Sequence, residues 1–198
     1  RVHKKEWRIG DTINAAIGQG YVLTSPLQLA VMTSRIASGR AVLPRLIKTI
    51  NEVETPIAPA PPLDLGIDQL QAVHRGMFAV VNGDHGTARA SRVADATMLM
   101  CGKTGTAQVR NISAAERETG VVKNDNLPWE QRDHALFVGF APAEAPRYAV
   151  AVVVEHGGGG SAVAAPIARD ALLAALTGGV PPLTAYPVEQ QTDRKSTR

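Results

Sequence analysis

The chain has 198 residues, of which 44% are hydrophobic and 20% are charged, an ordinary composition for a soluble globular protein. Such a composition excludes a disordered or fibrous chain. The 21 basic and 18 acidic residues are spread along the sequence and only 4% of residues are aromatic, so no nucleic-acid partner is expected.

The first clear structural signal is a helix between Ser25 and Gly39. Ser25 can cap its first turn, and Gln28 stands where a capping box requires a glutamine or glutamate. Gly39 is the kind of residue that ends helices. The β-branched segment 42–53 then predicts one or two short strands, and the proline-rich segment 55–63 predicts an extended surface connector.

A second helix and three strands follow. Apolar residues recur at helical spacing over residues 67–81. The short apolar runs 97–109, 134–141 and 147–155 are each bounded by polar or turn residues, as in neighbouring antiparallel strands. With a last helix over 164–176, the expected fold class is α/β in the broad sense (α+β), an antiparallel sheet flanked by helices.

Two segments are predicted to lack a fixed place in this fold. Residues 110–132 are charged and far longer than a connection between two adjacent strands requires, which favours a mobile excursion. Residues 179–198 are mostly polar and predict a disordered tail. One domain is therefore expected over residues 1–178.

The heptapeptide MCGKTGT, which ends at Thr106, raises the possibility of a phosphate-binding loop around Lys103. A P-loop needs a glycine five residues before Gly102, and that position is Thr97. The preceding residues are apolar and have no loop character. The sequence therefore places Lys103 on a strand.

A Lys-Thr-Gly-Thr strand has its own chemistry. The ammonium of Lys103 and the hydroxyls of Thr104 and Thr106 can together receive a carboxylate. Gly105 would leave room for an extended peptide to lie along the strand. From these four residues alone, an exposed strand with a surface lysine is an equally good interpretation.

Other motifs fail on inspection. The segment EHGGGGSAVAA fits part of a dinucleotide fingerprint, but no second strand with an acidic residue follows. We interpret it as a turn where glycines let the chain reverse, or where a ligand passes close to the backbone. The five histidines lack metal-ligand spacing, and His134 is interpreted as a hydrogen-bonded structural residue. Cys101, the single cysteine, is interpreted as a small core residue. No metal and no cofactor are expected.

In context, KTGTAQV resembles the third signature of the penicillin-recognising serine transpeptidases. Four further segments are similar, in chain order, to the C-terminal half of class B penicillin-binding proteins: WRIGDTINAAIGQGYVLTSPLQLA, HGTA, DHALFVGFAP and EHGGGG. Within that class, the elongation-type, rod-shape transpeptidases are most alike. The resemblance runs from about Trp7 to Gly178. It implies the serine β-lactamase-like transpeptidase fold.

The resemblance also implies roles and partners. Lys103 would supply positive charge, Thr104 and Thr106 would bind the substrate carboxylate, Gly105 would keep the groove open, and the Thr106 N–H would serve the oxyanion hole. The partners implied are peptidoglycan stem peptides, β-lactam antibiotics and a membrane glycosyltransferase of the elongation machinery. The implied location is the periplasmic face of the bacterial inner membrane, with an upstream anchor.

The chain departs from the family pattern in one respect. None of its seven serines has a lysine three residues on, and none begins an S-x-N element. Because the chain starts at Arg1, we expect a fragment or processed product. Its upstream half, as part of the same protein or as another chain, is expected to carry the nucleophile. The alternative is a non-catalytic penicillin-sensing or scaffold module; nucleotide binding is a third interpretation.

Overall fold

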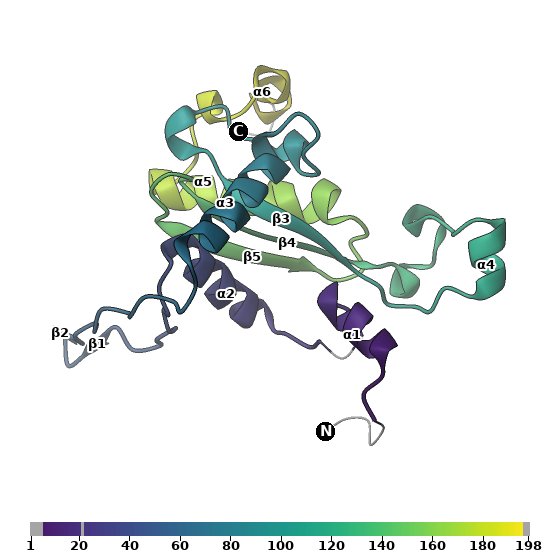
Figure 1. Ribbon diagram of the computed structural model, residues 1–198. Helices are drawn as coiled ribbons and strands as arrows, with labels where there is room; N and C mark the ends of the chain where they lie inside the picture. Colours follow the sequence, from purple (N-terminus) through teal and green to yellow (C-terminus); the bar gives the residue numbers. More distant parts are fainter. Residues whose placement is uncertain (1–5, 21, 196–198) are drawn as a thin grey trace.

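A three-stranded antiparallel sheet forms the centre of the computed structural model, which describes residues 6–20 and 22–195. Its strands lie in the order β3-β4-β5, with helices over both faces (Figure 1). The helices and strands are α1 (Ile9–Ala16), α2 (Pro26–Ser38), β1 (Thr49–Ile50), β2 (Val53–Glu54), α3 (Ile67–Asn82), β3 (Cys101–Ala107), α4 (Ala114–Thr119), β4 (His134–Ala141), β5 (Tyr148–Val154), α5 (Ala165–Thr177) and α6 (Val188–Lys195).

The predicted antiparallel sheet is confirmed, with one strand shorter than expected. The run 97–109 forms a strand only from Cys101 to Ala107. Before it, the Asp95 carboxylate accepts hydrogen bonds from the Thr97 N–H at 2.8 Å and the Thr97 hydroxyl at 2.6 Å. These bonds hold residues 96–98 in a 3₁₀ turn, because a side-chain acceptor there competes with extended backbone.

Each face of the sheet is covered by its own hydrophobic cluster. Phe137 and Val152 face α5, where Leu172 and Leu173 close the larger cluster. On the opposite face, a smaller cluster packs α2 and α3 against the sheet, and its buried members are Met77, Cys101 and Phe140. Since side chains alternate along a strand, these two coverings fix which β3 residues point to each side.

The three long helices, α2, α3 and α5, form where the sequence predicts them. The Ser25 hydroxyl accepts from the Gln28 N–H, the Gln28 side chain accepts from the Ser25 N–H, and Gly39 ends α2 in the left-handed conformation. The segment before Ser25, for which the sequence predicts no helix or strand, contains the additional helix α1. The β-branched segment makes the two short strands β1 and β2.

The excursion between β3 and β4 has internal structure. It contains α4 and two 3₁₀ turns, and it extends away from the sheet in Figure 1. Arg110 donates two hydrogen bonds to the Glu116 carboxylate, at 2.7 and 2.5 Å. These bonds, with a further one from the Val122 N–H, lower the pKa of Glu116 to about 2. The mobility of the excursion stays a prediction.

The predicted disorder of residues 179–198 is wrong for the part that the structure describes. Residues 183–185 form a 3₁₀ turn and α6 follows, while residues 196–198 lie outside the described part. Ala185 and Tyr186 are buried in the main core. Mean polarity misled the prediction, because two apolar residues with a suitable partner surface are enough to fix a segment. The domain boundary at residue 178 stays a prediction.

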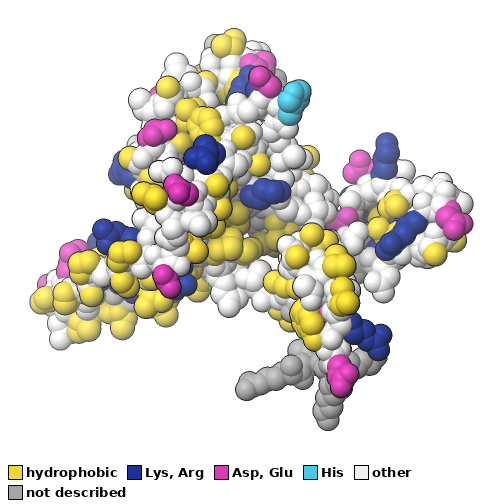
Figure 2. Space-filling view, in the orientation of Figure 1, with side chains coloured by type: hydrophobic (Ala, Val, Ile, Leu, Met, Phe, Trp, Pro, Cys, Tyr) yellow, Lys and Arg dark blue, Asp and Glu magenta, His cyan; other side chains and the backbone are white. Residues whose placement is uncertain are grey.

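Apolar side chains also lie on the surface around the N-terminal part of the chain. Figure 2 shows them gathered over α1 and over the β1–β2 hairpin. Ile9 is 83% exposed and Leu46 fully exposed. Within the described residues, none of the helices combines the length and apolar character needed to cross a bilayer.

Candidate substrate-binding strand

The Lys-Thr-Gly-Thr segment lies on β3, an edge strand of the central sheet. Thr104 stands opposite Phe137 and Thr106 opposite Ala135 in the register with β4. Both threonines therefore share the α5 side of the sheet, whereas Lys103 and Gly105 point to the opposite side. The predicted carboxylate receptor thus has its hydroxyls on one face and its cation on the other.

Lys103 turns back towards the strand that carries it. Its side chain is exposed, and its Nζ donates a hydrogen bond to the Thr104 carbonyl oxygen at 2.8 Å. The backbone groups of Thr104 and Thr106 point to the same side of β3, because N–H and C=O directions repeat every second residue. The ammonium charge is thereby held at the backbone between the two threonines.

Thr104 has a partner that sequence reasoning did not assign. Its hydroxyl lies 3.0 Å from the hydroxyl of Thr87, which belongs to the HGTA motif. A Cβ on Gly86 would stand 2.4 Å from the Val80 carbonyl oxygen, so only glycine lets this turn fold back onto α3. That return brings Thr87 beside β3. The HGTA motif is visible in the sequence, but its distance along the chain from the KTGT segment does not predict this contact.

The glycine run after β5 lies directly against the backbone of β3 and β4. A Cβ on Gly160 would stand 2.3 Å from the Leu136 carbonyl oxygen and 2.4 Å from that of Gly105. Gly158 adopts a positive φ of 80° where the chain reverses. The chain reversal predicted from the sequence is confirmed, whereas the close passage of a ligand along this backbone stays a prediction.

A histidine pair joins the glycine run to the excursion. His134 Nδ1 accepts the His156 N–H at 2.9 Å, and the two rings meet edge-on with centroids 4.7 Å apart. His156 also lies 4.4 Å from the Trp129 ring, centroid to centroid, and its Nδ1 is 3.0 Å from the Arg132 carbonyl oxygen. The structural role predicted for His134 is confirmed.

A cavity of about 610 Å³ opens at the C-terminal end of β3. One wall is formed by residues 105–111 and Leu136, and the other by residues 17–20 and 22–23 after α1. Gly105 contributes no side chain to it, and a Cβ there would stand 3.3 Å from Leu136 Cβ. The cavity is large enough for a small ligand or a short peptide segment.

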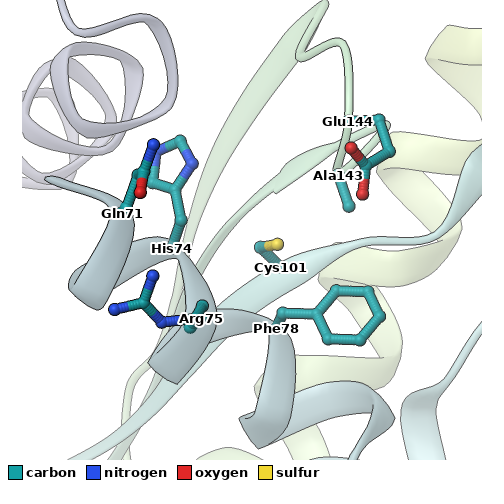
Figure 3. A pocket seen from close by; sticks show the side chains of 7 residues that line it. All are labelled: Gln71, His74, Arg75, Phe78, Cys101, Ala143 and Glu144. Carbon is teal, nitrogen blue, oxygen red and sulfur yellow. The ribbon is translucent and has the colours of Figure 1, made fainter. Parts of the chain in front are cut away.

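A second cavity, of about 510 Å³, lies at the other end of β3 between α3 and the β4–β5 turn (Figure 3). Cys101 faces it, and burial, together with the negative charge of Glu144, raises the pKa of the Cys101 thiol to about 11. Such a thiol stays protonated and is a poor nucleophile at neutral pH. The interpretation of Cys101 as a core residue is confirmed.

Within the described residues, no three acidic, histidine or cysteine side chains lie together in a way that suits a metal ion. The polar groups at the KTGT segment itself include the hydroxyls of Thr87 and Thr104 and the Lys103 ammonium. These are groups suited to binding an anion or an extended peptide.

Comparison with known proteins identifies the family. The model of the penicillin binding protein transpeptidase domain matches residues 2–173. The chain belongs to this family. The class B, elongation-type resemblance and the mixed helix and antiparallel-sheet fold predicted from sequence are both confirmed.

Two relatives and two solved structures define the likeness. The chain is 36% identical to peptidoglycan D,D-transpeptidase MrdA of Haemophilus influenzae, covering 96% of this chain and 30% of that protein. To MrdA of Escherichia coli K12 it is also 36% identical, covering 81% and 25%. Among structures, Pseudomonas aeruginosa PBP2 in complex with WCK 5153 superposes with a TM-score of 0.65 at 39% identity, covering 93% and 37%. Helicobacter pylori PBP2 in complex with MreC gives 0.67 at 32% identity, covering 88% and 29%. The chain thus spans little more than a third of these relatives at most.

Proposed function

We propose that this transpeptidase chain supplies the substrate-binding strand of a peptidoglycan D,D-transpeptidase. The complete enzyme would cross-link stem peptides through a serine acyl-enzyme, and β-lactams would acylate the same serine. The observation that carries the proposal is the KTGT segment on an edge strand, with Thr104 and Thr106 on one face.

The arrangement supports a separate role for each residue of the KTGT segment on β3. The Thr104 and Thr106 hydroxyls would bind the terminal carboxylate of the stem peptide, and the Lys103 ammonium would add positive charge from the strand edge. The Thr106 N–H would stabilise the oxyanion of the tetrahedral intermediate. Gly105 would leave the groove unobstructed.

The nucleophile is proposed to lie outside this chain. A serine needs a base within hydrogen-bonding reach, and none of the serines here is followed by lysine at the third position. The chain would therefore bind and orient substrate, and a complementary upstream part of the protein would perform the covalent step. That part would also carry the membrane anchor on the periplasmic side.

Fluorescent penicillin tests this proposal. The complete protein should be labelled at one serine, and the 198-residue chain should not be labelled. In the complete protein, Lys103→Ala should slow acylation by about 10- to 1,000-fold, the range typical of losing one electrostatic element of a site. Lys48→Ala, on the distant β1–β2 hairpin, is the matched control and should leave the rate unchanged.

Each alternative gives a different result. Stoichiometric labelling of the chain alone would contradict the assignment of the nucleophile to another segment. A complete protein that binds penicillin without acylation would favour a penicillin-sensing or scaffold module. MreC accompanies the Helicobacter pylori relative in its structure, and a glycosyltransferase of the elongation machinery is the partner that we propose here.

A further inference from the structure

The hydroxyl pair between Thr87 and Thr104 extends the proposed site by one residue. We propose that Thr87 is a positioning residue: its hydroxyl donates to Thr104 Oγ1 and so aims the Thr104 proton at the anionic end of the substrate. The two oxygens lie 3.0 Å apart. This inference rests on the proposed function, because it assumes that Thr104 binds a carboxylate.

The direction of the hydrogen bond follows from counting protons. A hydroxyl has one proton and two lone pairs, whereas a carboxylate can only accept. If Thr104 gives its proton to the carboxylate, its oxygen can only accept from Thr87. In the free protein either hydroxyl can donate, so ligand binding would select one direction of the pair.

In a chain of hydrogen bonds, each bond strengthens the next. A donor that is itself accepting a hydrogen bond is polarised and binds an anion more strongly. Within the described residues, Thr87 is the side chain that bonds to the Thr104 hydroxyl. The Lys103 ammonium cannot take this place, because it donates to the Thr104 carbonyl and stands on the other side of β3.

The backbone on both sides of Thr87 is fixed. Gly86 lies against the carbonyls of Ala79 and Val80, where any side chain would collide with them. Ala88 is 1% exposed, and its N–H donates to the Val80 carbonyl at 2.9 Å. Thr87 itself is exposed, so a rigid turn presents an accessible hydroxyl, as the supporting residue of a binding site requires.

Substitution by valine isolates the hydroxyl. Valine keeps the branched shape of threonine and removes only its polar group. In the complete protein, Thr87→Val should slow acylation by benzylpenicillin about three- to ten-fold, the loss typical of one hydrogen bond. Thr87→Ser, which retains a hydroxyl, should restore most of the rate.

The carboxylate dependence separates positioning from a structural effect. Benzylpenicillin methyl ester offers no anion to the strand, so it should acylate the protein more slowly than the acid. Thr87→Val should lower this ester rate by less than about two-fold. In a Thr104→Val background, Thr87→Val should cause no further loss with either compound. Thr97→Val is the control, because the exposed Thr97 hydroxyl donates to Asp95 before β3 and lies outside the proposed site. It should leave both rates unchanged.

The outcomes are distinguishable. Equal losses with the acid and the ester, a persistent loss in the Thr104→Val background, or a failure of Thr87→Ser to recover would each overturn the role of Thr87 alone. Absence of labelling in the unsubstituted complete protein would overturn the proposed function, and the inference with it.

Discussion

The two ends of the chain use apolar side chains in opposite ways. At the N-terminal end, α1 is amphipathic but has no buried residue, and Ile13 is 62% exposed. At the C-terminal end, a more polar segment buries Ala185 completely and leaves Tyr186 only 2% exposed. Apolar content alone therefore does not decide which end packs against the core.

The difference lies in the bonds that accompany burial. The Ala94 N–H donates to the Ala185 carbonyl at 2.8 Å. The Gln190 side chain accepts a hydrogen bond from Arg169 and donates one to the Ala90 carbonyl, each at 2.7 Å. The Arg169 guanidinium also lies 4.9 Å from the centre of the Tyr186 ring. A segment docks where its polar groups find partners as its apolar groups leave water.

The largest effect is expected at the C-terminal end. Tyr186→Ala should lower the free energy of unfolding by about 3 to 4 kcal/mol, because it leaves a cavity in the main core and removes the ring beneath Arg169. Chemical denaturation of the chain measures this. Val188→Ala, at a position 79% exposed, is the control and should change stability by less than about 0.5 kcal/mol. A small loss for Tyr186→Ala would show that the segment is not docked in solution.

An intermediate effect is expected in the excursion, which has few buried side chains but a well-formed ion pair. Since the pKa of Glu116 falls from 4.5 to about 2, its contribution is fully present above pH 4.5 and is lost as the pH falls towards 2. Hydrogen exchange of residues 113–122 should therefore lose protection across that window. The measurement compares protection factors at several pH values, corrected for intrinsic exchange rates.

Glu116→Gln should remove this pH dependence, because the amide cannot ionise. Glu118→Gln, which removes an exposed carboxylate on the same helix, should preserve it. The same pH profile in Glu116→Gln as in the unsubstituted chain would contradict the assignment to the Arg110–Glu116 pair.

The smallest effect is expected at the N-terminal end. Ile13→Gln should change the stability of the chain by less than about 0.5 kcal/mol, because glutamine is a good helix former and no core contact is lost. Denaturation with far-ultraviolet circular dichroism detection is sufficient. A loss above 1 kcal/mol would mean that α1 packs against the chain in solution, and the contrast between the two ends would disappear.

The sequence by itself determined the main helices, the three strands of the central sheet and the family. These elements depend on interactions between residues close in the sequence, so spacing predicts them. Examples are the capping box of Ser25 and Gln28, the left-handed Gly39 and the alternating apolar runs. It also placed the KTGT segment on a strand, since the absence of a glycine at Thr97 excludes the phosphate-binding loop.

Only the tertiary structure decided how distant segments combine. The contact between Thr87 and Thr104 depends on the return of the chain after Gly86, and the approach of Gly160 to β3 depends on how α5 packs on the sheet. The order of residues 183–195 depends on partners in α5 and in the segment before β3. These contacts join residues 17 to 100 positions apart, and sequence periodicity carries no information on such pairs because it reports only on neighbours within one helix or strand.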